Sequence, residues 1–125
     1  MLNHNRTFLI VDDEPDFAVI LEMMLKRAGY QTITASSGGE ALGLIQQHQP
    51  DVVLLDDMLP IMNGSEVCRR LKQNPSTASI PVILMSAAEQ RLRDHNFIQT
   101  IGADCVLIKP FKLDELVEVA ARLLA

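Results

Sequence analysis

Polar residues that could do chemistry stand directly after four short apolar runs of the sequence. Asp12-Asp13-Glu14 ends the first run, Asp56-Asp57 the third, Ser86 the fourth and Lys109-Pro110 the fifth. Clustered carboxylates disfavour each other's ionisation unless a cation intervenes, and Mg²⁺ prefers such oxygens and keeps waters for a phosphate. An aspartate can attack phosphorus to form an acyl phosphate, while a lysine and a hydroxyl hold the other phosphoryl oxygens. The residue types therefore predict Mg²⁺-assisted phosphoryl transfer to an aspartate.

These residues meet only if the apolar runs are neighbouring parallel strands. Short apolar runs alternate with segments whose apolar residues recur at helical spacing. Strict alternation predicts a parallel sheet with helices on both faces, and ligands of such sheets bind beyond the carboxyl ends of the strands. Strands are expected at 7–11, 31–35, 52–55, 81–85 and 105–108, and helices at 17–28, 36–49, around 67–71, 90–101 and 113–124.

The totals place the chain among single-domain globular proteins. It has 125 residues, of which 48% are hydrophobic, so residues 1–125 are expected to form one domain. The net charge of -5 argues against direct nucleic-acid binding. No apolar stretch is long enough to span a membrane, and the first residues do not resemble a signal peptide. Cys68 and Cys105 lack disulfide or metal-site spacing, which predicts reduced thiols in a cytoplasmic protein.

Taken together, these motifs resemble the receiver domain of two-component response regulators, including the single-domain chemotaxis-type regulators. The matching residues are Asp12-Asp13, DDMLPIMNG from Asp56 to Gly64, Ser86, GAD from Gly102 to Asp104, and Lys109-Pro110. The resemblance covers essentially the whole chain. It implies a flavodoxin-like, doubly wound α/β fold with five helices and a five-stranded parallel sheet in the order 2-1-3-4-5. It also implies a phosphoacceptor switch that catalyses only its own phosphorylation and slow dephosphorylation, and not an enzyme in the usual sense.

The resemblance assigns the metal and the phosphoryl group to particular residues. Asp56 is the implied phosphoacceptor because it stands four residues before Pro60. Asp13 is the implied direct ligand of Mg²⁺ and Asp12 an assisting ligand through water. The backbone carbonyl of Met58 completes the protein's share of the coordination.

Three further roles follow from the same resemblance. Lys109 corresponds to the lysine that pairs first with the acceptor and then with a phosphoryl oxygen. Ser86 corresponds to the switch hydroxyl that moves toward the phosphoryl group. The Lys109-Pro110 bond is usually cis in this family.

Successive strand residues point to opposite faces, so Asp57 is interpreted as a solvated neighbour of Asp56 at the rim.

Two positions depart from the usual pattern of the family. Val106 occupies the switch position where relatives often carry an aromatic ring that turns inward, and a valine cannot make that movement. Met58 and Ala88 stand two residues after the acceptor and the switch hydroxyl, where neither side chain can orient a water by hydrogen bonding. We therefore expect slow loss of the phosphoryl group.

The implied partners are proteins. A sensor histidine kinase or a histidine phosphotransfer protein would supply the phosphoryl group, and a downstream target or output domain would read the switch. Val119 and Leu123 are interpreted as part of a broad core face; the alternative is a partner surface or a homodimer interface on the fourth-helix, fifth-strand, fifth-helix face. The sequence is consistent with a stand-alone regulator and with the receiver part of a longer chain.

Three other functions fit parts of the pattern. A phosphatase of the haloacid dehalogenase type also uses an aspartate nucleophile, but it carries a second aspartate where this chain has Met58. A flavodoxin-like nucleotide binder needs a glycine-rich or hydroxyl-rich loop after the first strand, where Asp12-Asp13-Glu14 would repel a phosphate; the later SSGG, from Ser36 to Gly39, is interpreted as a helix start. A degenerate receiver used only for docking would not need the complete acidic, hydroxyl and lysine set.

Overall fold

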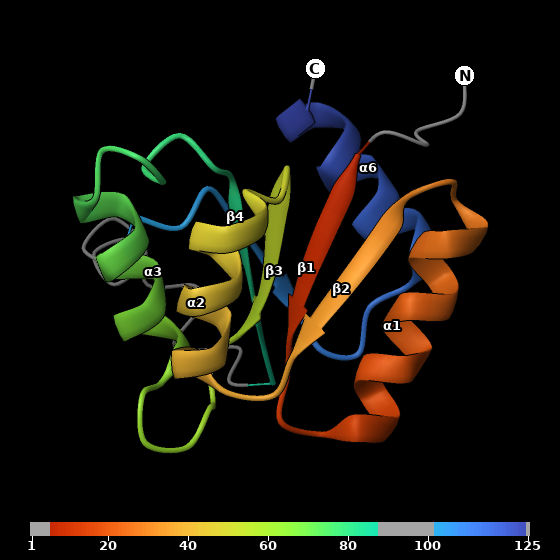
Figure 1. Ribbon diagram of the computed structural model, residues 1–125. Helices are drawn as coiled ribbons and strands as arrows, with labels where there is room; N and C mark the ends of the chain where they lie inside the picture. Colours follow the sequence, from red (N-terminus) through yellow and green to blue (C-terminus); the bar gives the residue numbers. More distant parts are fainter. Residues whose placement is uncertain (1–5, 88–101, 125) are drawn as a thin grey trace.

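Five parallel strands form the centre of the molecule in the computed structural model, which describes residues 6–87 and 102–124 (Figure 1). Their order across the sheet is β2-β1-β3-β4-β5, which confirms the predicted order. The strands are β1 (Thr7–Val11), β2 (Gln31–Ala35), β3 (Val52–Asp56), β4 (Val82–Ser86) and β5 (Cys105–Ile108).

The register of the strands brings their carboxyl ends to one edge. Val11 of β1 pairs with Leu55 of β3, so the residues that follow, Asp12 and Asp56, lie at the same level. On the other side of β3, Asp56 pairs with Met85. Ser86 in turn pairs with Ile108, the residue before Lys109. All four predicted strand ends therefore reach the same edge of the sheet.

Helices cover both faces of the sheet in two layers (Figure 1). Helices α2 (Gly38–His48) and α3 (Gly64–Gln73) lie on one face, and α1 (Pro15–Arg27) and α6 (Leu113–Leu124) lie on the other. The strands are apolar at successive positions because each face needs its own apolar residues.

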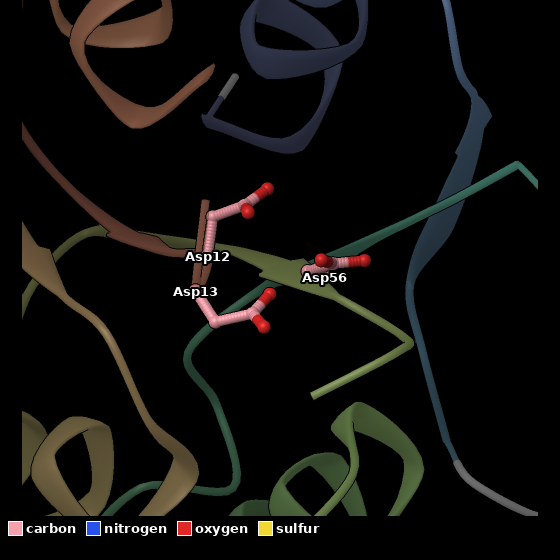
Figure 2. Close-up of side chains that lie close together, drawn as sticks. All are labelled: Asp12, Asp13 and Asp56. Atoms are coloured by element: carbon pink, nitrogen blue, oxygen red, sulfur yellow. The ribbon is translucent and has the colours of Figure 1, made fainter. Parts of the chain in front are cut away.

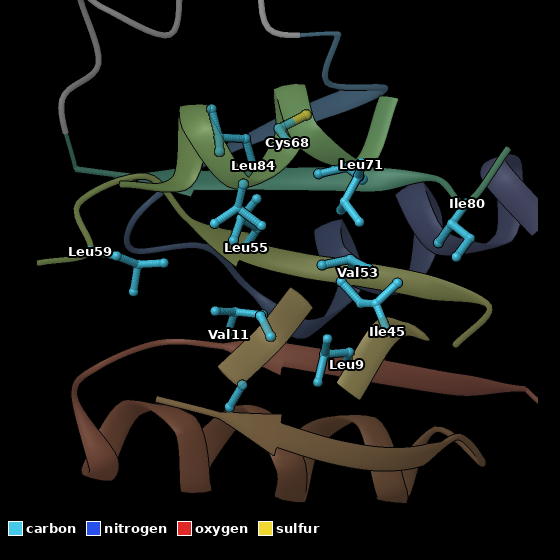
Figure 3. Packing of buried hydrophobic residues seen from close by; sticks show 14 residues of the cluster. Leu9, Val11, Ile45, Val53, Leu55, Leu59, Cys68, Leu71, Ile80 and Leu84 are labelled. Carbon is cyan, nitrogen blue, oxygen red and sulfur yellow. The ribbon is translucent and has the colours of Figure 1, made fainter. Parts of the chain in front are cut away.

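The first hydrophobic cluster fills the space between the sheet and helices α2 and α3 (Figure 3). The strands supply alternate residues to it, among them Leu9, Val53 and Leu84, while Ile45 comes from α2 and Leu71 from α3. These side chains are at most 2% exposed. Burying one such side chain stabilises the fold by roughly 1.5–3 kcal/mol.

The second cluster uses the intervening strand residues on the opposite face. Phe8, Leu54 and Ile83 pack there against Leu25 of α1 and Leu116 of α6. The prediction that the last helix has a broad core face is confirmed, because Val119 is buried in this cluster and Leu123 packs against it.

Local sequence signals start the helices next to the functional edge. The Ser37 hydroxyl accepts a hydrogen bond from the Glu40 backbone N–H, so the serine–glycine stretch is a helix start, as predicted. Asn63 caps α3 in the same way through Glu66. Helix α1 begins at Pro15, whose fixed φ suits the first turn.

The predicted number of helices needs correction. Four helices, not five, are found in the described ranges 6–87 and 102–124. The fifth helix was expected over 90–101, which lies outside the described residues. That segment also has the weakest helical pattern of the five, because only Phe97, Ile98 and Ile101 are well aligned. Within the described part, none of the helices is both long and apolar enough to cross a membrane.

Neither cysteine is part of a disulfide. Cys68 is buried on α3 and Cys105 is half-buried at the start of β5, and both are free thiols, as predicted. Burial raises the pKa of the Cys68 thiol to about 11. The thiolate, which is the reactive form, is therefore scarce at neutral pH.

The close approach of α3 to β3 generates a test of the fold. A Cβ on Gly64 would lie 2.2 Å from the Asp56 carbonyl oxygen, so Gly64→Ala must displace backbone at Asp56. We expect it to lower the free energy of unfolding by about 2–4 kcal/mol in urea denaturation. The matched control is Gly43→Ala in α2, where a Cβ would meet nothing within 4 Å. That change should stabilise by about 0.5–1 kcal/mol, and equal midpoints for the two variants would contradict the packing described.

Candidate functional site

Asp12 and Asp56 project toward the same side of the sheet. Asp12 continues the alternation of Phe8 and Ile10, and Asp56 continues that of Val52 and Leu54. All four apolar residues pack in the second cluster. Both side chains therefore lie on the face covered by α1 and α6. They are nearly buried, with 2% of Asp12 and 4% of Asp56 exposed.

Three carboxylates converge at this edge. Figure 2 shows Asp12 and Asp13 at the end of β1 beside Asp56 at the end of β3. One oxygen from each lies within 4.8 Å of the others. Asp13 is exposed, unlike its two neighbours, so the cluster opens to solvent on its side.

Lys109 compensates part of this negative charge. Its Nζ lies 3.2 Å from Asp12 Oδ2 and 3.5 Å from Asp56 Oδ2, and its side chain is only 16% exposed. The three carboxylates and the one ammonium leave an excess of two negative charges. The Lys109-Pro110 peptide bond is cis, as the resemblance implied.

Comparisons with known proteins agree with this geometry. A family model for the response regulator receiver domain matches residues 8–121. This chain belongs to the receiver domain family of response regulators. It therefore belongs to two-component signalling, as its sequence motifs predicted.

Individual relatives place the receiver domain in more than one kind of protein. The alkaline phosphatase synthesis transcriptional regulatory protein PhoP of Bacillus subtilis (strain 168) is 38% identical over 86% of this chain, which spans 43% of that relative's length. The receiver domain of a signal transduction histidine kinase from Syntrophus aciditrophicus is 35% identical, with a TM-score of 0.85, over 95% of this chain and 89% of that one.

A third relative was solved with a metal. It is the receiver domain of the sensor histidine kinase PA1611 from Pseudomonas aeruginosa PAO1, with a magnesium ion coordinated in its active site cleft. That structure is 26% identical to this chain, with a TM-score of 0.87, and the likeness covers 95% of this chain and 97% of that one.

The carboxylates of this receiver domain fit a single divalent ion. Mg²⁺ binds oxygen at about 2.1 Å, so two ligands on opposite sides of one ion stand about 4.2 Å apart. The three oxygens of Asp12, Asp13 and Asp56 lie within 4.8 Å of one another, which is close to that span. The excess charge of two at the cluster also matches a divalent cation.

Met58 lies two residues after Asp56, beside the cluster. Its backbone N–H donates to Asp56 Oδ1 at 3.2 Å. Met58 and Asp13 line the same surface hollow, together with Leu59, Pro60 and Asn63. This arrangement puts the Met58 backbone near the predicted metal ligand, while its side chain is 64% exposed.

The two predicted switch residues lie on neighbouring strands. Ser86 ends β4 and is fully buried, and its backbone carbonyl accepts a hydrogen bond from the Lys109 N–H at 2.9 Å. Val106 pairs with Leu84 and is half-buried against the first cluster. Ala88, the other position that bears on hydrolysis, lies outside the described residues.

The interpretation of Asp57 as a solvated residue was wrong. Asp57 is fully buried, and its Oδ1 accepts a hydrogen bond from the Ser65 hydroxyl at 3.1 Å. Ser65 is in the first turn of α3, and Gly64 also binds the Asp57 carbonyl through its N–H. Asp57 therefore joins β3 to α3 on the face opposite Asp56. Its contacts stabilise the fold.

One contact of the site was not predicted from the sequence. Lys109 Nζ lies 4.4 Å from the centroid of the Phe17 ring. Phe17 stands at helical spacing with Ile20, Leu21 and Met24, and such spacing does not distinguish a core ring from a ring beside an ammonium.

Burial also affects the protonation of Asp56. Burial raises the pKa of the Asp56 carboxyl; the Lys109 ammonium opposes this rise, and the Asp12 carboxylate adds to it. The folded protein therefore holds a proton at pH values where the unfolded chain, with its ordinary pKa of 3.8, has lost it. Stability falls as the pH rises through that window and stays lower above it.

Asp56→Asn should remove this loss of stability. In the presence of a chelator at pH 7, we expect the variant to melt at a higher temperature than the unchanged protein, because a neutral amide avoids the cost of a buried charge. The difference should shrink toward pH 4, where the Asp56 carboxyl of the folded protein is increasingly protonated. Melting temperatures followed by circular dichroism would contradict this account if Asp56→Asn melted lower at pH 7.

Proposed function

We propose that this receiver domain accepts a phosphoryl group on Asp56 from a phosphohistidine of a partner protein. The observation that carries the proposal is the position of Lys109, whose ammonium contacts both Asp12 and Asp56 at the carboxyl edge of the sheet. A second carboxylate, Asp12, holds the ammonium in place before and after transfer. Asp56 is thus a carboxylate nucleophile with a cation beside it.

The reaction exchanges one bond to phosphorus for another. An oxygen of Asp56 attacks phosphorus, the bond between phosphorus and the histidine nitrogen breaks, and the electron pair goes to the imidazole, which takes a proton from water. The product is an aspartyl phosphate. As Asp56 loses its own charge to the new bond, Lys109 can pair with an oxygen of the phosphoryl group.

The residues that would hold Mg²⁺ are Asp13 and Asp56 directly, Asp12 through water, and Met58 through its backbone carbonyl. When bound, Mg²⁺ neutralises the charge that develops on the phosphoryl oxygens. The protein's own part is to bring the oxygens of three aspartates within reach of one ion.

The output of the switch is proposed to pass through Ser86. Its place at the end of β4, directly beside β5 and Lys109, supports a movement of its hydroxyl toward the phosphoryl group. Val106 is half-buried next to β4 and has no aromatic ring to turn inward. We therefore propose that this chain signals phosphorylation without an aromatic switch.

Receiver domains interact with histidine kinases and with output domains, and both classes are the proposed partners here. A sensor histidine kinase or a phosphotransfer protein would supply the phosphoryl group. A homodimer through the fourth-helix, fifth-strand, fifth-helix face, a single domain over residues 1–125 and a cytoplasmic location remain predictions from the sequence. The family match disfavours the phosphatase and nucleotide-binding alternatives; a docking-only receiver is distinguished by the next experiment.

Phosphorylation can be tested by weighing the intact protein after incubation with Mg²⁺ and acetyl phosphate. We expect a gain of one phosphoryl group that Asp56→Asn abolishes, because an amide cannot act as the nucleophile. The matched control is Asp57→Asn, which keeps an acceptor for the Ser65 hydroxyl and should leave phosphorylation intact. If Asp57→Asn abolished the gain and Asp56→Asn did not, the acceptor would be the neighbouring residue. No gain in any protein would indicate a docking-only receiver.

Metal binding can be tested without phosphorylation. Mg²⁺ that binds only the folded protein raises its stability by mass action, by about 2.7 kcal/mol at one hundred times the dissociation constant. We expect the melting temperature of the unchanged protein to rise between chelator and tens of millimolar Mg²⁺. Asp13→Asn, which removes an exposed ligand, should show a much smaller rise. An unchanged melting temperature for the unchanged protein would contradict the proposed metal site.

A further inference from the structure

Lys109 is held from two sides. Its ammonium faces carboxylate oxygens of Asp12 and Asp56, at 3.2 and 3.5 Å, and it also lies over the Phe17 ring, at 4.4 Å from the centroid. A cation over an aromatic face is attracted by the ring, and the attraction grows as water is removed. The Lys109 side chain is only 16% exposed, so this contact is largely desolvated.

The Phe17 ring is itself fixed in place. It packs edge-to-face against Phe111, with 6.2 Å between the ring centroids and 79° between the ring planes. Both rings also pack against the second hydrophobic cluster. Phe111 directly follows the Lys109-Pro110 bond. The ring that packs against Phe17 therefore belongs to the same short segment as the ammonium.

The same helix end is tied to the carboxylate cluster. The backbone N–H of Glu14 donates to Asp12 Oδ1 at 2.9 Å, immediately before α1 begins at Pro15. Phe17 lies in the first turn of that helix. The position of the ring relative to Asp12 is therefore set by one short, hydrogen-bonded segment.

A lysine at this place needs such support. Its four-carbon stem is flexible, and its three N–H donors can rotate among several acceptors. When Asp56 is esterified by the phosphoryl group it loses its own charge, and the ammonium must remain where it can meet a phosphoryl oxygen. Among its contacts with the described residues, those with Asp12 and the Phe17 ring do not involve the reacting carboxylate.

We propose that Phe17 is a positioning residue for phosphoryl transfer, which holds the Lys109 ammonium at the acceptor through its ring face. The inference rests on the proposed role of Asp56 and Lys109, and it adds a residue whose action is exerted on the lysine and not on the phosphoryl group.

The test compares the rates of phosphorylation by acetyl phosphate at saturating Mg²⁺. Because acetyl phosphate is the donor, no partner protein is involved. We expect Phe17→Leu to lower the rate constant by about 5- to 10-fold, which corresponds to about 1–1.4 kcal/mol. Phe17→Tyr keeps a ring of similar electronic character and should restore the rate to within about twofold. Ile20→Ala is the matched control: it removes an apolar side chain that is 47% exposed on the same helix, and should leave the rate unchanged.

A fluorinated ring separates the cation contact from packing. Pentafluorophenylalanine at position 17 keeps nearly the shape of Phe17 but reverses the charge distribution of the ring face, so the rate should fall about as far as in Phe17→Leu. A rate equal to that of the unchanged protein would show that the ring only packs, and would overturn the inference. Melting temperatures of all variants would show whether any loss of rate follows a loss of folding.

A second readout needs no phosphorylation. The ε-methylene protons of Lys109 should resonate upfield in the NMR spectrum of the unphosphorylated protein because they lie near the ring face, and Phe17→Leu should remove that shift. Unshifted resonances of these protons in the unchanged protein would contradict the contact between Lys109 and the Phe17 ring. If the shift is present but no protein gains a phosphoryl group, the proposed function fails. If the unchanged protein is phosphorylated and Phe17→Leu reacts at the same rate, only the positioning role fails.

Discussion

The repulsion among three carboxylates at one sheet edge is the constraint on which this site depends. Asp12 and Asp56 are nearly buried, and buried carboxylates of like charge are costly unless a cation lies beside them. Lys109 supplies one positive charge within 3.2 and 3.5 Å. The remaining negative excess is what makes the site suited to a divalent cation. The molecule therefore keeps a region of unfavourable charge in the free state, which the proposed binding of Mg²⁺ would relieve.

The rest of the fold serves to hold these charges at fixed distances. The parallel register sets Asp12 level with Asp56, and the two apolar clusters hold the strands between their helical layers. On the far face of β3, the hydrogen bond between Asp57 and Ser65 and the close approach of Gly64 fix β3 to α3. The geometry of the site thus depends on contacts made on both faces of the sheet.

Much of this arrangement could be predicted from the sequence, and the exceptions have physical reasons. Strand positions, their order and the convergence of Asp12, Asp56 and Lys109 followed from alternating apolar runs and from the family motifs. The burial of Asp57 did not, because alternation along the strand turns Asp57 away from Asp56 but does not show that Ser65, eight residues later, covers it. Of the five predicted helices, four are found in the described residues, and the one with the weakest apolar pattern was expected outside them.

The central claim is that Lys109 offsets the negative charge of a site that is otherwise built for a divalent cation. Its most direct test is the Mg²⁺ affinity of Lys109→Met, measured by NMR titration of backbone amides beside the unchanged protein. Loss of the ammonium leaves three carboxylates without a cation, so the variant should bind Mg²⁺ severalfold more tightly and should be less stable in chelator. An affinity equal to or weaker than that of the unchanged protein would contradict the account.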